Sequence, residues 1–126
     1  MEERAKRYLD EVKKEYGYVP VTNQVLSCRP DIFVPSFDFG KSVFEGKSSF
    51  DPKMRHLLGL AAAAALGGEY CMKAQMKDAK DLGATEDEVI EVLEIAAYMC
   101  MTRSQSYSFR EFAEQYGKEI KEIRDQ

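Results

Sequence analysis

Residues 50–97 read FDPKMRHLLGLAAAAALGGEYCMKAQMKDAKDLGATEDEVIEVLEIAA, and this stretch decides the fold class. Asp51 followed by Pro52 is the pattern of a helix N-cap and a first helical position. An apolar, alanine-rich run continues from there to a pair of glycines. A second helix is predicted over residues 69–82, with Gly83 as its stop signal. Successive helices joined by short connections predict an all-α domain.

Thr85 and Glu88 have the spacing of a capping box, which opens a further helix. Towards its end this helix is apolar over most of its circumference, so we expect it to be central. A separate, final amphipathic helix is expected over residues 103–123.

Upstream of the decisive stretch, an amphipathic helix is predicted over residues 2–16, followed by a short helix over residues 20–28. Residues 32–44 are rich in Phe and Val, which also suit a strand. A helix is preferred there because the apolar residues recur near helical spacing. The chain is therefore expected to form one domain, residues 1–126, of six or seven helices.

The composition of the chain indicates which partners and which cellular compartment to expect. The 18 basic and 22 acidic residues are interspersed and give a formal net charge of −4, so nucleic acid and anionic membranes are not expected partners. The charged N-terminus does not resemble a secretory signal, and the longest apolar run is far shorter than the about 20 residues of a membrane span. A cytoplasmic protein is expected. The three widely spaced cysteines predict neither a disulfide framework nor a zinc site, and no cofactor is expected.

Cys71 is the first candidate for chemistry. It lies near the start of the helix that follows the glycine pair, where the positive end of the helix dipole lowers a thiol pKa and favours the nucleophilic thiolate. The structural alternative is a small, buried packing residue.

His56, the single histidine, is the second candidate, as a general base. The alternative is a partly exposed polar side chain with no chemical role. The charged run over residues 77–81 is interpreted as a solvated helix face, and the alanine-rich run as a surface for close helix packing.

The segments DPKMR, EYC and GATEDEVIEVLEIAA, with YGYVPVTNQVLSCRPDIF upstream, resemble the carboxymuconolactone decarboxylase family, and within it the alkylhydroperoxidase D-like (AhpD-like) branch. The resemblance covers most of the chain. It implies an all-helical bundle that assembles as a homotrimer or homohexamer.

The resemblance also implies a site, of which this chain keeps one position of four. Cys71 takes the place of the second cysteine of the family's C-x-x-C motif, whereas Gly68 takes that of the first. Gln75 stands at the motif's histidine, and His56 at an upstream glutamate. We expect His56 and Gln75 to flank one cavity, His56 as base and Gln75 as hydrogen-bond donor. Cys100 is a candidate to resolve a sulfenic acid formed on Cys71.

Three functions are therefore compared. The first is a thiol-dependent peroxidase, an antioxidant activity of the peroxiredoxin type, or a disulfide oxidoreductase, with Cys71 as nucleophile and a peroxide as small-molecule substrate. The second is a cofactor-free lyase or isomerase acting on a small carboxylate through His56, Gln75 and Arg103. The third is a family member that has lost catalysis and acts in binding or assembly.

Overall fold

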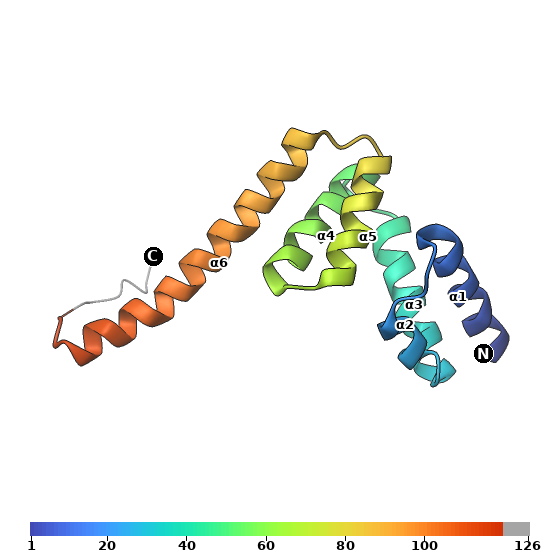
Figure 1. The fold of residues 1–126 in the computed structure, drawn as a ribbon, viewed down its shortest axis with the longest axis horizontal. Helices are drawn as coiled ribbons and strands as arrows, with labels where there is room; N and C mark the ends of the chain where they lie inside the picture. The colour runs from blue at the N-terminus through green and yellow to red at the C-terminus, as the bar shows by residue number, and fades with distance from the viewer. Residues whose placement is uncertain (120–126) are drawn as a thin grey trace.

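Six helices follow one another along the part of the chain that the computed structural model describes, residues 1–119, and no strand occurs there. Figure 1 shows α4 and α5 side by side at the centre, α1 to α3 on one flank, and α6 leading away on the other. The all-α prediction is confirmed. The helices are α1 (Glu2–Tyr16), α2 (Val21–Leu26), α3 (Pro30–Glu45), α4 (Pro52–Leu66), α5 (Glu69–Asp81) and α6 (Glu86–Gln115).

The helix ends form where the capping residues predict them. The side chain of Asp51 accepts a hydrogen bond from the backbone N–H of Met54, which caps α4. Thr85 and Glu88 form both hydrogen bonds of a capping box at the start of α6. Gly67 adopts the left-handed conformation, with φ of 78°, and ends α4.

The expectation of two helices after Thr85 is wrong, because α6 is one continuous helix of 30 residues. Residues 99–103 contain neither glycine nor proline, so nothing there breaks a helix. The hydroxyl of Thr102 donates to the carbonyl of Met99, and that of Ser106 donates to Thr102, which keeps these polar groups within the helix. The predicted end near residue 123 lies outside the described residues.

The expectation that this helix is central is also wrong. In Figure 1 α6 leaves the body after its first turns beside α4, and its second half extends alone. Ala96 and Ala113 are its buried residues in the described chain, while large apolar side chains along it are exposed. Within residues 1–119, α4 covers the first half of α6 and leaves the apolar side chains of its second half exposed.

The core forms around α3 and α4. Phe33, Val34 and Leu60 are the largest fully buried side chains. Arg4 and Tyr8 of α1 both hydrogen-bond Asp38 of α3, which joins the N-terminal helices. None of the helices in residues 1–119 combines the length and the apolar character that crossing a lipid bilayer requires.

Candidate functional site

Cys71 is the third residue of α5 and is exposed. The alternative that it is a buried packing residue is therefore wrong. Gly68, at the N-cap of the helix, carries no side chain that could cover the sulfur. Backbone N–H groups in the first turn of a helix lack intrahelical partners and carry the positive end of the helix dipole. The thiol thus lies in a reachable position beside this partial positive charge.

A cavity of about 750 Å³ opens beside Cys71 between helices α1 to α5. Cys71, His56 and Gln75 all line it, so the structure gathers three of the four residues that the sequence singled out. Cys71 and Gln75 are four residues apart on α5 and share one face of that helix. His56 reaches the same space from α4. The cavity volume is in the range of sites that bind small organic molecules.

His56 is held by two direct contacts. Its Nδ1 atom lies 2.8 Å from Oε1 of Gln75, and its ring stacks on that of Phe44, with centroids 4.8 Å apart and planes 9° apart. The His56 side chain is only 14% exposed. These contacts fix the orientation of the imidazole ring, as a general base requires.

Asp78 and Tyr16 extend this pair into a polar network. Oδ2 of Asp78 lies 3.8 Å from Nδ1 of His56, and the Tyr16 hydroxyl donates to the same oxygen at 3.0 Å. Burial raises the pKa of Asp78, whereas the hydrogen bond from Tyr16 opposes that rise. Burial, followed by the charge of Asp78, raises the pKa of Tyr16, which therefore stays a hydrogen-bond donor at neutral pH.

The sequence analysis missed this network, and its interpretation of residues 77–81 as a solvated face is wrong for Asp78, which is 19% exposed. Helical spacing could have found it. Cys71, Gln75 and Asp78 stand at i, i+4 and i+7, one face of a helix. Tyr16 gave no comparable signal, because only the packing of α1 brings it close.

The contacts of Nδ1 favour one tautomer of His56. Both neighbours of Nδ1, the oxygens of Gln75 and Asp78, are hydrogen-bond acceptors. With Oε1 of Gln75 as acceptor, the proton of the neutral ring belongs on Nδ1, and Nε2 keeps the lone pair of a base. Towards His56, Gln75 is therefore an acceptor and not the hydrogen-bond donor that the sequence analysis expected.

Gly59 provides the space that Gln75 occupies. A Cβ atom at residue 59 would lie 2.7 Å from Oε1 of Gln75 and 3.2 Å from Cζ of Phe44. A Cβ contact of 2.7 Å does not occur between real atoms, so the amide takes this position because residue 59 has no side chain. Gly59 is a third residue, after Asp78 and Tyr16, that the sequence analysis did not identify.

Cys100 and Arg103 lie elsewhere. Both are exposed on α6 and neither lines the cavity. The Cys100 thiol donates to the backbone carbonyl of Ala65, at the end of α4, over 3.6 Å. Cys28, also exposed, donates to the carbonyl of Gln24.

Three carboxylates near the cavity are close enough to share a cation. Oxygens of Glu15, Asp78 and Asp81 lie within 4.8 Å of one another. Nζ of Lys77 lies 2.8 Å from Asp81 and 3.6 Å from Glu15, so a lysine side chain already supplies positive charge there. We assign no metal to this cluster.

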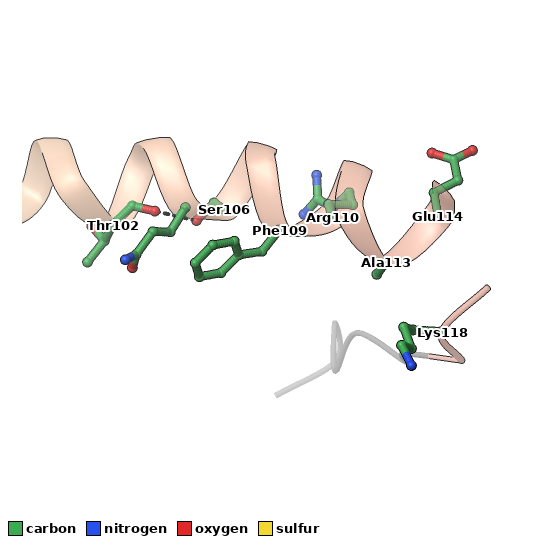
Figure 2. Close-up of a pocket in the computed structure, with 8 residues that line it drawn as sticks. Thr102, Ser106, Phe109, Arg110, Ala113, Glu114 and Lys118 are labelled. Atoms are coloured by element: carbon green, nitrogen blue, oxygen red, sulfur yellow. Dashed lines mark hydrogen bonds between the residues drawn. The ribbon is translucent and has the colours of Figure 1, made fainter. Parts of the chain in front are cut away.

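A second concavity, of about 690 Å³, follows the far end of α6 (Figure 2). Phe109 and Ala113 form its apolar part, and Figure 2 shows Thr102 and Ser106 joined by a hydrogen bond along one edge. No cysteine or histidine lines it. It is a surface feature of the extended helix, remote from Cys71.

Comparison with known proteins agrees with this architecture. The chain is 36% identical over 66 residues to the uncharacterized protein MJ1511 of Methanocaldococcus jannaschii, an alignment that covers 52% of this chain and 61% of that protein. No solved structure gives a significant match. The sequence profile of the carboxymuconolactone decarboxylase family matches residues 30–114, which include α4, α5 and the Cys71 cavity. With an all-helical fold and a match over more than half of its length, this chain belongs to the carboxymuconolactone decarboxylase family.

Proposed function

We propose that the protein is a thiol-dependent peroxidase of the AhpD-like kind, with Cys71 as its nucleophile. One observation carries the proposal: an exposed thiol in the first turn of α5 shares a cavity with the oriented His56–Gln75 pair. A nucleophile, a base and a residue that orients the base are the parts that thiol chemistry needs.

In the proposed reaction, His56 acts as the base and Cys71 as the nucleophile. Nε2 of His56 accepts the thiol proton, and the Cys71 thiolate attacks the terminal oxygen of a hydroperoxide. The O–O bond breaks, a bond forms between sulfur and oxygen, and the leaving alkoxide takes the proton from His56. The peroxide gains two electrons and becomes an alcohol, while Cys71 loses two and becomes a sulfenic acid.

Recycling needs a second thiol. Gly68 stands where a neighbouring cysteine would resolve the sulfenic acid, and Cys100 lies on α6 outside the cavity. We therefore assign the reduction to two equivalents of an external small thiol. The first displaces water and forms a mixed disulfide with Cys71, and the second releases the free thiol. Cys100 is kept as a resolving candidate, and Cys100→Ser tests it.

The lyase alternative, acting on a small carboxylate, is less well supported. The cavity presents five carboxylate side chains, and Arg103, the cation that this alternative used, lies outside it. A carboxylate substrate would meet like charges there. In the third alternative, a protein without catalysis, Cys71 would not form a sulfenic acid.

The test is to trap the sulfenic acid. The protein is treated with an organic hydroperoxide and the sulfenate reagent dimedone, and the modified peptides are quantified by mass spectrometry. We expect modification at Cys71, its loss in Cys71→Ser, and no change in the matched variant Cys28→Ser. His56→Ala should slow sulfenate formation by about a hundredfold. Equal modification of Cys28 and Cys71 would contradict the proposal.

A further inference from the structure

The lining of the cavity beside Cys71 carries more negative than positive charge, although Lys41 pairs with Glu11 at 3.2 Å. Five carboxylate side chains line it, whereas Lys41 supplies the one lysine or arginine among its lining residues. Lys77, just outside the lining, binds Glu15 and Asp81 and offsets part of that charge. An excess of negative charge remains even when this lysine is counted. The carboxylates are those of Glu11, Glu15, Glu45, Asp78 and Asp81.

Aromatic rings form part of the remaining walls. Six aromatic rings line the cavity, and two of them, Tyr18 and Tyr70, are in contact with centroids 6.4 Å apart and planes tilted by 49°. Aromatic faces accept hydrocarbon groups and carry negative potential that attracts cations. The rings are those of Tyr16, Tyr18, Phe33, Phe37, Phe44 and Tyr70.

The excess of carboxylates and the aromatic rings both favour the approach of uncharged or cationic molecules to the Cys71 sulfur over that of anions. A cleft lined by one sign of charge concentrates molecules of the opposite sign and repels those of the same sign. The aromatic rings add affinity for apolar groups of a molecule. A molecule that also bears an anionic group would still be repelled by the carboxylates. Neither feature favours a carboxylate, a sulfonate or a phosphate.

We propose that this cavity selects the molecules that react with Cys71 by charge, admitting uncharged or positively charged organic compounds and excluding anions. The inference rests on the proposed function insofar as it names the substrate class: an uncharged or cationic organic hydroperoxide. The selection itself concerns access to the sulfur and is measurable with any thiol reagent.

The experiment uses methanethiosulfonate reagents that differ in charge: one bears a trimethylammonium group, one a benzyl group and one a sulfonate. In each reaction the Cys71 thiolate attacks the reagent's sulfenyl sulfur, a mixed disulfide forms and methanesulfinate leaves. Rates at Cys71 are measured by peptide mass spectrometry on the intact protein. Each is divided by the rate for the same reagent on the urea-unfolded chain, which removes intrinsic reactivity.

We expect the normalised rate of the sulfonate reagent to be about tenfold or more below that of the trimethylammonium reagent, with the benzyl reagent close to the latter. The difference should shrink in 1 M salt, because screening weakens interactions between exposed charges. Equal normalised rates for the three reagents, or a ratio that salt does not change, would overturn the proposal.

Glu45→Gln provides the matched variant, because Glu45 lines the cavity at the end of α3 without belonging to the His56 network. Its control, Glu94→Gln, makes the same change in net charge on an exposed position of α6. Glu45→Gln should raise the sulfonate rate several-fold, and Glu94→Gln should leave it unchanged. Equal effects of the two variants would show that net charge, rather than the cavity, decides.

This test separates the two proposals. Charge selection at Cys71 without a trapped sulfenic acid would disprove the peroxidase and leave the selective cavity. Sulfenic acid formation without charge selection would leave the peroxidase and disprove the selectivity.

Discussion

The Nδ1 atom of His56 lies 2.8 Å from Oε1 of Gln75, a contact that joins α4 to α5 inside the Cys71 cavity. By the family resemblance these positions would hold a glutamate and a histidine, so this chain has a histidine and an amide instead. The carboxylate is supplied from a third place, because Asp78 lies 3.8 Å from the imidazole. The polar groups of the site are thus rearranged rather than lost.

Replacing Gly59 by alanine should break the His56–Gln75 contact. The added Cβ would lie 2.7 Å from the amide oxygen at the flexible end of Gln75, so this side chain must turn away, and the lost contact should make unfolding easier by about 1 kcal/mol. NMR of the single imidazole should show the proton leaving Nδ1.

The matched control is Gly40→Ala in α3, where a Cβ meets nothing within 4 Å. That variant should be more stable by about 0.5–1 kcal/mol. Destabilisation in both variants would contradict the role given to Gly59.

Gly68→Cys should form a disulfide with Cys71. A Cβ at residue 68 would lie 3.4 Å from Cβ of Cys71 and 3.8 Å from its sulfur, and disulfides join Cβ atoms about 3.5–4.5 Å apart. We expect mild oxidation to remove two free thiols per chain, counted with a chromogenic disulfide, and mass spectrometry to find the 68–71 link. The same substitution in a Cys71→Ser background should remove none. A bridge to Cys100 instead would show that α5 does not hold the two sulfurs together.

Asp78→Asn should change how stability depends on pH. Because burial raises the pKa of Asp78 in the folded state, the folded chain binds a proton at higher pH than the unfolded chain does. This residue therefore makes the protein less stable as pH rises from the unfolded carboxyl pKa through the raised folded value.

An asparagine oxygen still accepts the hydrogen bond of Tyr16, so the variant should keep its fold and lose this contribution. Urea unfolding across pH 3–8 measures it, with Asp81→Asn as control. Parallel pH profiles of wild type and Asp78→Asn would contradict the assignment.

We propose that α6 packs against further copies of the chain in a homotrimer or homohexamer. The surface area is 9836 Å², whereas a compact monomer of 14.4 kDa exposes about 6,800 Å². Large exposed apolar patches of this kind indicate interaction surfaces. The exposed apolar side chains of this helix and its C-cap are Ile90, Ile95, Tyr98, Met99, Met101, Tyr107, Phe109, Phe112 and Tyr116.

Sedimentation of the wild type should therefore show a trimer or hexamer, and Phe109→Asp should dissociate it. Phe39→Asp changes a phenylalanine on α3 that is 73% exposed, against 60% for Phe109, and serves as the control. A wild-type monomer, or equal dissociation by both variants, would contradict the proposal.

The ends of a helix could be predicted from the sequence where a capping or stop residue lies at that end. Asp51, Thr85 and Gly67 satisfy or terminate backbone hydrogen bonds within a few residues of themselves, so sequence spacing was enough to place these ends. The site was predictable in part, because the place of Cys71 at a helix start follows from the sequence, whereas Gln75 was expected through the family resemblance. The approach of His56 from α4 was expected through the family resemblance and not from spacing.

The sequence by itself determined the helical class, the caps and the position of Cys71 in the first turn of α5, because these depend on interactions between residues close along the chain. Only the tertiary structure decided that Tyr16 and Asp78 join His56, that Gly59 admits Gln75, and that α6 extends away from the body. Each of these depends on contacts between segments far apart in sequence, which local patterns do not encode.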